Sequence, residues 1–180
     1  AYLPQQTSIF RGLSVYENLL GIAQITKKSS NEQKSIVEKI MAEFSITHLR
    51  DVKATALSGG ERRRTEIARC LINNPKVLLL DEPFAALDAM TREELQIDLL
   101  KLCHLQGTTV LFITHDISES VYLSDKIAVM ENGSIQKEFR IDIPKPRNDN
   151  IRYQAAFNKL CSEVRKSMRT SSVKQDVGGI

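Results

Sequence analysis

The stretch LSGGERRRTEIARCLINNPKVLLLDEPFAALD, residues 57–88, decides how this chain folds. Ser58 and Glu61 have the Ser-x-x-Glu spacing of a capping box, which predicts the start of a helix. Gly59 and Gly60 lack a Cβ, so a ligand can approach the backbone closely there. The N–H groups of the first turn and the helix dipole favour an anion. A capping box alone marks a helix start far more often than an anion site.

The same stretch predicts a buried strand after the helix. The helix is expected to turn its arginines outward and to end at Asn73-Asn74-Pro75. The unbroken apolar run of residues 77–80 predicts a strand that is covered on both faces. Asp81 and Glu82 follow where that strand ends, at the usual ligand edge of a parallel sheet. The helix is expected to bury four residues: Ile67, Ala68, Leu71 and Ile72.

The remaining chain alternates helical and extended patterns, which predicts an α/β fold. Asn132-Gly133 between two apolar runs predicts a closing β-hairpin. Ser30 and Gln33 are expected to start a helix whose apolar stripe ends at Phe44. The other elements are expected at these positions: helices from Ser14-x-x-Glu17 to about residue 24, over 91–105 with a stop at Gly107, over 117–124 and over 149–168, and strands over 108–113, 126–130 and 134–139.

Composition places the chain among ordinary soluble globular proteins. Of its 180 residues, 42% are hydrophobic and 26% are charged, and no apolar run is long enough to span a membrane. Cys70, Cys103 and Cys161 are odd in number and widely spaced, which favours reduced thiols over a disulfide framework or a zinc site. The net charge of +3 is uneven, since residues 140–180 hold nine Lys/Arg and four Asp/Glu. That basic end suits anionic headgroups or nucleic acid, but a solvated polar tail is the more ordinary interpretation.

Five motifs in one order resemble those of ABC ATPases. Residues 57–61 (LSGGE) are similar to the signature motif, residues 77–82 (VLLLDE) to the Walker B strand and residues 86–88 (ALD) to the D-loop. Residues 2–5 (YLPQ) resemble the Q-loop, and residues 114–116 (THD) resemble the switch-histidine loop. The resemblance covers residues 1 to about 140 and makes a P-loop NTPase-like fold the expectation.

The resemblance also implies a domain organisation. We expect a partial ABC ATPase domain over residues 1–147, with a helical subdomain over about 8–74 that carries the signature motif. Residues 75–140 are expected to hold the parallel-sheet core and the C-terminal hairpin. Residues 148–180 are expected to form a C-terminal helix and a polar tail.

The resemblance assigns roles in ATP hydrolysis to the matching positions. Asp81 is expected to hold Mg²⁺, since hard cations prefer carboxylate oxygen, and Gln5 to reach the metal or the water. Glu82 is the candidate general base for the attacking water. His115 is expected to contact the γ-phosphate and to link it to Glu82.

The signature residues are implied to work across a dimer. Ser58 and Gly60 would face ATP held by the P-loop of a second ATPase subunit, most simply a second copy. The resemblance also implies that Gln5, Gly59 and Asp88 bind the nucleotide. No G-x-x-x-x-G-K-[ST] motif occurs, and no glycine precedes a lysine. We therefore expect a fragment truncated at its N-terminus, inactive alone, with a natural degraded or regulatory product as the alternative.

The partners implied are transmembrane permease subunits, with membrane contact only through them and no nucleic acid. The chain would then be cytoplasmic, peripheral on the inner face of the membrane. In this family the region from Gln5 to Leu20 meets the permease. On physical grounds alone, Phe10 and Leu13 fit that interface and an ordinary core equally well.

Substrate assignment differs along the chain. Residues 2–85 resemble the ATPase of lipopolysaccharide export, through YLPQQTSIFRGLSVYENL and LSGGERRRTEIAR. Residues 86–147 resemble ATPases of nitrate, sulfonate or taurine importers, and the Ala-Leu-Asp-Ala D-loop departs from the export pattern. Export is favoured and import is the alternative. A soluble ABC ATPase, or a chain that only completes a partner's ATP site, is the alternative of another class.

Overall fold

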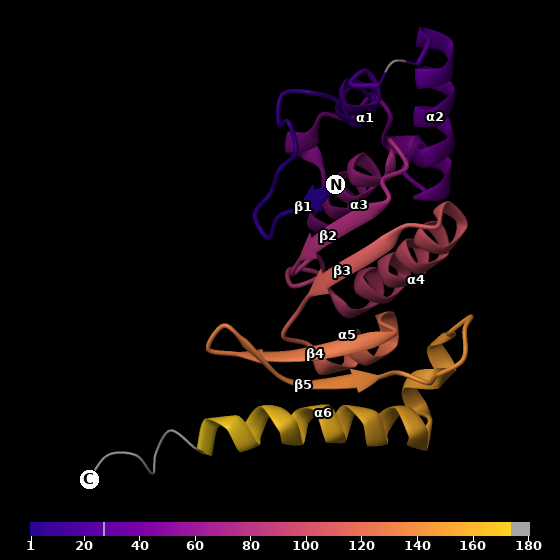
Figure 1. Cartoon of the computed structure of the whole chain (residues 1–180). Helices are drawn as coiled ribbons and strands as arrows, with labels where there is room; N and C mark the ends of the chain where they lie inside the picture. Colours follow the sequence, from indigo (N-terminus) through magenta and orange to yellow (C-terminus); the bar gives the residue numbers. More distant parts are fainter. Residues whose placement is uncertain (27, 174–180) are drawn as a thin grey trace. The chain divides into compact units, whose positions relative to one another are not determined.

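The computed structural model describes residues 1–26 and 28–173 and divides the chain into two compact units, residues 1–113 and 114–180 (Figure 1). The end of the expected polar tail, residues 174–180, lies outside the described residues.

The first unit is built on a parallel three-stranded sheet in the order β1-β2-β3. The strands are β1 (Tyr2–Leu3), β2 (Val77–Asp81) and β3 (Thr109–Ile113). Leu3 lies opposite Leu80, and Asp81 lies opposite Ile113. The predicted parallel-sheet core is therefore confirmed, and the three strands end at one edge.

Four α-helices accompany this sheet, and each begins at a side-chain cap. They are α1 (Val15–Ala23), α2 (Ser30–Glu43), α3 (Gly59–Leu71) and α4 (Ala89–Gln106), with short 3₁₀ turns at Thr47–Leu49 and Ala54–Ala56. Ser58 closes the predicted capping box with Glu61, and Gly107 ends α4 in the left-handed conformation.

α2 begins at Ser30 as predicted, but its capping residue differs from the expected one. Ser29, not Ser30, is the cap, because its Oγ accepts from the Glu32 amide while the Glu32 carboxylate accepts from the Ser29 amide. The negative charge of Glu32 in the first turn also interacts favourably with the helix dipole. Gln33, the expected partner of Ser30, is uncharged and gives no such interaction.

The core of the first unit lies against one face of the sheet. Leu78 and Leu80 are fully buried there, and so is Leu3. The four residues predicted on the buried stripe of α3 are all buried: Ile67, Ala68, Leu71 and Ile72.

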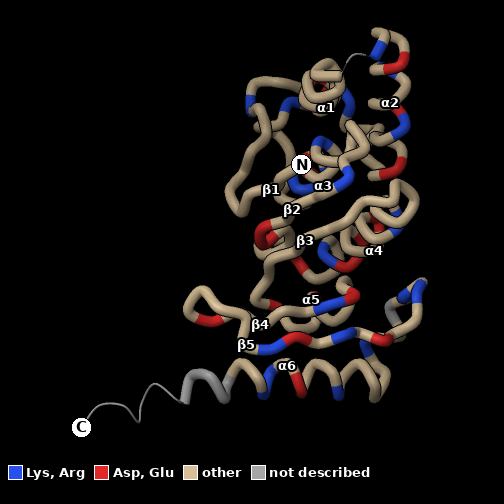
Figure 2. The backbone as a smooth tube through the Cα atoms, in the orientation of Figure 1, with Lys and Arg blue, Asp and Glu red and all other residues tan. Residues whose placement is uncertain are grey.

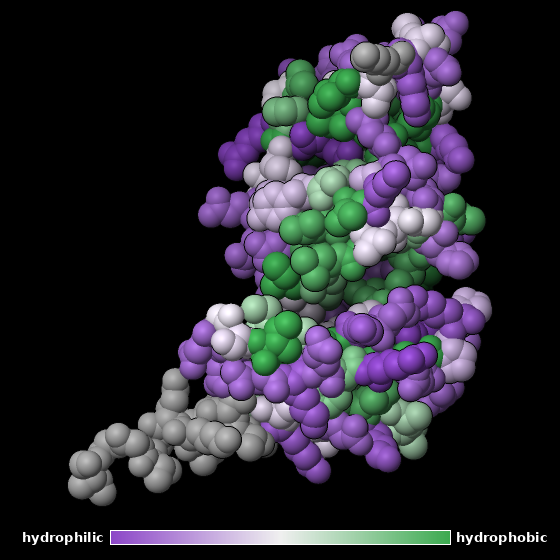
Figure 3. Space-filling view, viewed as in Figure 1, coloured by the Kyte–Doolittle hydropathy of each residue, from purple (hydrophilic) through white to green (hydrophobic). Residues whose placement is uncertain are grey.

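The other face of the sheet is exposed, so the prediction of a strand covered on both faces was wrong. Val77 is 49% exposed and Leu79 is 36% exposed. Tyr2, Leu111 and Ile113 share that face by register and are also exposed. Figure 3 shows apolar side chains gathered where Figure 1 places β2 and β3. A continuous apolar run suits burial on both faces, but it cannot report what covers the second one.

A second correction concerns the arginines of α3. Arg62 and Arg64 are partly exposed, but Arg63 is buried among backbone carbonyls and the carboxylate of Glu66. A charged side chain can lie inside when it is paired and hydrogen-bonded, which helical periodicity alone does not reveal.

The second unit contains the predicted hairpin and C-terminal helix. It consists of α5 (Ile117–Leu123), β4 (Lys126–Glu131), β5 (Ser134–Arg140), a 3₁₀ turn (Asp149–Tyr153) and α6 (Ala155–Val173). Asn132 and Gly133 have φ of 49° and 76°, as a two-residue hairpin turn requires. Along α6 a single acidic residue, Glu163, lies between Lys159 and Arg165 (Figure 2).

The three cysteines were expected to be reduced thiols. Cys70, Cys103 and Cys161 are all free. Across the ranges 1–26 and 28–173, no helix has the length and apolarity that crossing a bilayer requires.

The two faces of β2 lead to a matched test of stability. Leu80→Ala should reduce the free energy of unfolding by about 2–5 kcal/mol, since it leaves a cavity in the core. Leu79→Ala on the exposed face should cost less than about 1 kcal/mol. Urea unfolding of both variants measures the difference, and equal losses would contradict a sheet buried on one face.

Candidate functional site

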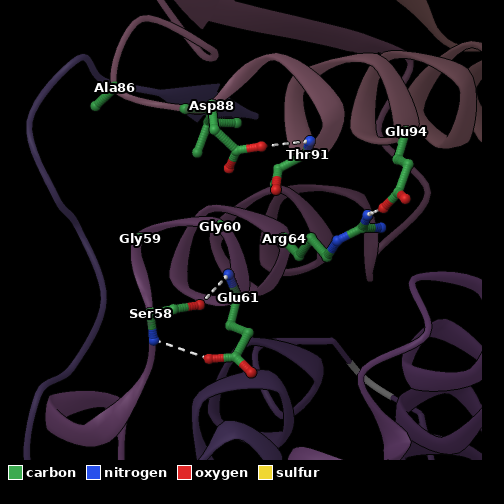
Figure 4. Close-up of a pocket in the computed structure, with 10 residues that line it drawn as sticks. Ser58, Gly59, Gly60, Glu61, Arg64, Ala86, Asp88, Thr91 and Glu94 are labelled. Carbon is green, nitrogen blue, oxygen red and sulfur yellow. Dashed lines mark hydrogen bonds and ion pairs between the residues drawn. The ribbon is translucent and has the colours of Figure 1, made fainter.

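The N-terminus of α3 is held by a closed capping box (Figure 4). The Ser58 Oγ accepts from the Glu61 amide at 3.3 Å, and the Glu61 carboxylate accepts from the Ser58 amide at 2.8 Å. The amides of Gly59 and Gly60 lie in the first turn, where a helix offers no internal acceptor. Because the Ser58 oxygen accepts here, its hydroxyl proton remains able to bind a ligand.

A pocket of about 330 Å³ lies between this helix start and the start of α4 (Figure 4). The structure therefore brings Asp88 beside Ser58, Gly59 and Gly60, four of the residues for which the resemblance implies nucleotide binding. The full lining is Ser58, Gly59, Gly60, Glu61, Arg64, Ala86, Leu87, Asp88, Thr91 and Glu94.

Close packing and ion pairs hold the two sides of the pocket together. A Cβ on Gly60 would lie 2.6 Å from the Thr91 methyl, so glycine permits the approach of the two helices. Asp88 caps α4 by accepting from the Thr91 amide at 3.0 Å. Arg64 donates to Glu94 and to Asp98, each at 2.6 Å. Sequence analysis missed Thr91 and Arg64, because no motif spacing links α3 to α4.

The charges around the pocket do not attract an anion. The hydrogen bonds from Ser58 lower the pKa of Glu61, and the hydrogen bond from the Thr91 amide lowers the pKa of Asp88. Both carboxyls are therefore ionised at neutral pH, and with Glu94 they outnumber the single guanidinium of Arg64. The site offers phosphate hydrogen-bond donors and open space at Gly59, while countercharge must come with the ligand.

Gln5, Asp81 and Glu82 come from the edge at which the parallel strands end. Asp81 is the last residue of β2, and Gln5 follows β1 by two residues. Glu82 has φ 44° and its amide donates to the Ile113 carbonyl at 3.0 Å. Left-handed φ in a non-glycine residue is a strained conformation that surrounding contacts must maintain.

The donor set at this edge fits Mg²⁺ that keeps most of its water. Among the residues the structure describes, no group of three or more His, Cys, Asp or Glu side chains is placed to hold a metal. Asp81 would thus supply a single carboxylate, and Gln5 an exposed amide. Mg²⁺ is commonly bound by one or two carboxylates together with substrate phosphates, so the arrangement suits a nucleotide-borne ion.

His115 belongs to the second unit and is exposed. It lies between Thr114, whose hydroxyl donates to Glu119 at 2.9 Å, and Asp116, whose side chain caps α5. The loop is thus braced on both sides of the histidine. Its action toward Glu82 stays a prediction.

Comparison with known proteins decides the family. The family described as ABC transporter matches residues 1–85, which include the signature and Walker B segments. The lipopolysaccharide export ATP-binding protein LptB of Escherichia coli K12 is 44% identical over 138 residues, 74% of this chain and 56% of LptB. The chain belongs to the ABC transporter family.

Two further ABC proteins show the range of relatives and the fold. The bicarbonate transport ATP-binding protein CmpC of Synechococcus elongatus is 38% identical over 166 residues, 89% of this chain and 25% of CmpC. The ATP-binding cassette MJ0796, solved as a dimer bound to ADP and phosphate, superposes with TM-score 0.68 at 28% identity, covering 78% of this chain and 62% of the cassette. The α/β P-loop NTPase-like fold is confirmed. This ABC chain spans about half of LptB and a quarter of CmpC.

The close approach of Gly60 to Thr91 can be tested with a destabilising substitution and a second substitution that should restore stability. Gly60→Ala should destabilise this ABC chain by about 1–3 kcal/mol, since the added methyl meets the stiff Thr91 side chain. Gly59→Ala, which faces open space, should be neutral or slightly stabilising. Thr91→Ser in the Gly60→Ala background removes the opposing methyl and should restore most of the thermal stability. Failure of that rescue would contradict the contact.

The capping box of α3 leads to a pH prediction. The pKa of Glu61 is lowered from 4.5, so its contribution to stability is complete above that pH and is lost as pH falls through the folded value. Glu61→Gln keeps a capping partner without the charge. The wild type should therefore lose its advantage in melting temperature over this variant as pH falls from 7 to below 4.5. A difference that stays constant across that range would contradict the prediction.

Proposed function

We propose that this ABC chain carries part of the ATP-binding and ATP-hydrolysing motor of a transporter. The observation that carries the proposal is the pocket that joins the glycine-rich start of α3 to Asp88. The position of Asp81 and Glu82 also supports the proposal. They lie where β2 ends, at the edge of the parallel sheet where α/β proteins usually bind ligands.

The residues divide the chemistry among them in this proposal. Asp81, with Gln5, would hold Mg²⁺ through oxygen atoms, which this ion prefers. Glu82 accepts a proton from the attacking water, and His115 binds the γ-phosphate. Bound Mg²⁺ would neutralise charge on the phosphate oxygens.

The pocket at α3 works as half of a site that a second ATPase subunit completes. Ser58, Gly59 and Gly60 offer hydrogen-bond donors, while the lining carboxylates leave no surplus of positive charge. The phosphates must therefore arrive with their countercharge, as they would on a P-loop lysine with Mg²⁺. The 180 residues contain no P-loop motif, and the similar MJ0796 cassette was solved as a dimer. A homodimer is the simplest arrangement.

Lipopolysaccharide export is the transport function we favour, with transmembrane permease subunits as partners and a peripheral position on the inner face of the cytoplasmic membrane. The resemblance of residues 2–85 to the export ATPase and the 44% identity to LptB support export. CmpC, a bicarbonate transport protein, is 38% identical, which keeps an importer as the alternative. Phe10 and Leu13 are 52% and 40% exposed, which suits a permease-facing loop better than a core.

ATP turnover by the chain, alone and joined to the P-loop part of LptB, tests this function. The joined protein should hydrolyse ATP with Mg²⁺, and Glu82→Gln should reduce kcat by about 10²–10⁴-fold because the water loses its base. Glu138→Gln, an exposed carboxylate on β5, is the matched control and should leave turnover unchanged. The 180-residue chain alone should be silent. Robust turnover by that chain, or full activity of the Glu82 variant, would overturn the proposal.

A further inference from the structure

Two charged residues of α3 form an ion pair inside the first unit. Arg63 and Glu66 lie one helical turn apart, with side chains 9% and 2% exposed, and their Nη1 and Oε2 atoms are 3.0 Å apart. Burial of charge is costly unless partners satisfy it, so the remaining hydrogen bonds of the pair show what it binds.

Glu66 binds the loop that follows β1. Its Oε1 accepts from the Ser8 amide at 2.7 Å and from the Ile9 amide at 3.2 Å. Both oxygens of the carboxylate are therefore used, one by the loop and one by Arg63.

Arg63 binds the turn that follows β2. Its Nε donates to the Pro83 carbonyl at 2.6 Å, and its Nη2 lies 3.4 Å from the carbonyls of Asp81 and Glu82. Its Nη1 also donates to the Pro4 carbonyl at 3.2 Å, directly before Gln5. The planar guanidinium can serve both segments at once because it has five N–H donors in a fixed geometry.

Arg63 and Glu66 thus form a hydrogen-bonded bridge between the two segments, beyond the point where β1 and β2 are paired. The pairing of β1 with β2 ends at Leu3 and Leu80, so the ladder does not set the separation between Gln5 and Glu82. Glu82 also has the left-handed φ of 44°, and the carbonyls on both of its sides are within reach of Arg63. Such a conformation persists when neighbouring contacts over-determine it.

We propose that Arg63 and Glu66 are positioning residues that hold the Gln5 loop and the Asp81–Pro83 turn in one fixed arrangement. The pair would place Gln5, Asp81 and Glu82 for the same phosphate and metal ion without touching either. This proposal rests on the proposed function for its effect on turnover, and on the hydrogen bonds alone for its effect on the backbone.

Hydrogen exchange in the 180-residue chain tests the bridge without any need for activity. Arg63→Lys keeps the positive charge but lacks the planar guanidinium with its several donors. It should speed hydrogen exchange of the Ser8 and Ile9 amides, which donate to Glu66 and not to Arg63. Glu66→Gln should in turn speed exchange of the Glu82 amide. Val37→Ala on α2, fully buried and away from the bridge, is the control for general destabilisation. Exchange that rises only at the mutated end, or as uniformly as in the control, would overturn the proposal.

Turnover in the joined protein tests the effect on catalysis. Arg63→Lys should lower kcat about 10–100-fold with little change in KM for ATP, since small misplacement of catalytic groups costs that much. Val37→Ala, at an equal loss of melting temperature, should retain kcat. A kcat that follows melting temperature alone in both variants would overturn the positioning role. A further outcome is that hydrogen exchange changes at both ends of the bridge as expected while the unmutated joined protein hydrolyses no ATP. That outcome would overturn the proposed function but leave the bridging role of Arg63 and Glu66 supported.

Discussion

Parallel pairing of β1, β2 and β3 is the constraint on which the first unit depends. Strands that run in one direction must each be followed by a connection that returns the chain to the opposite edge, and their ends collect at one edge. Gln5 and Asp81 reach that edge from segments about 75 residues apart in the chain. A hairpin topology would have placed them at opposite edges.

The helix α3 organises what surrounds that edge. Its first turn forms one wall of the pocket, its second turn carries Arg63 and Glu66, and its later residues fill the core against the sheet. One rigid element therefore sets the phosphate donors, the Glu82 turn and the Gln5 loop at the same time. A helix suits this task because successive turns present different residues at a fixed rise of about 1.5 Å per residue.

The charge pattern gives the pocket its character. The pocket offers hydrogen-bond donors but no surplus positive charge, so it attracts phosphate little by itself. Under the proposed function, such a surface closes on a nucleotide that a second subunit holds. The ion pairs of Arg64 with Glu94 and Asp98 keep the only lining cation engaged.

The sequence by itself determined the elements, since these follow from local rules, and its five motifs named the candidate site residues. Ser58-x-x-Glu61, Asn132-Gly133 and Gly107 act through the conformations of a few neighbouring residues, and the five motifs are contiguous in the chain. Only the tertiary structure decided that β2 is exposed on one face, that Asp88 lies beside Gly60, and that Arg63 is buried. These depend on contacts between residues far apart in the chain. A stripe of apolar residues shows that a face is buried but not against what. An arginine at a helical position has the same pattern whether it meets water or, as Arg63 does, four backbone carbonyls.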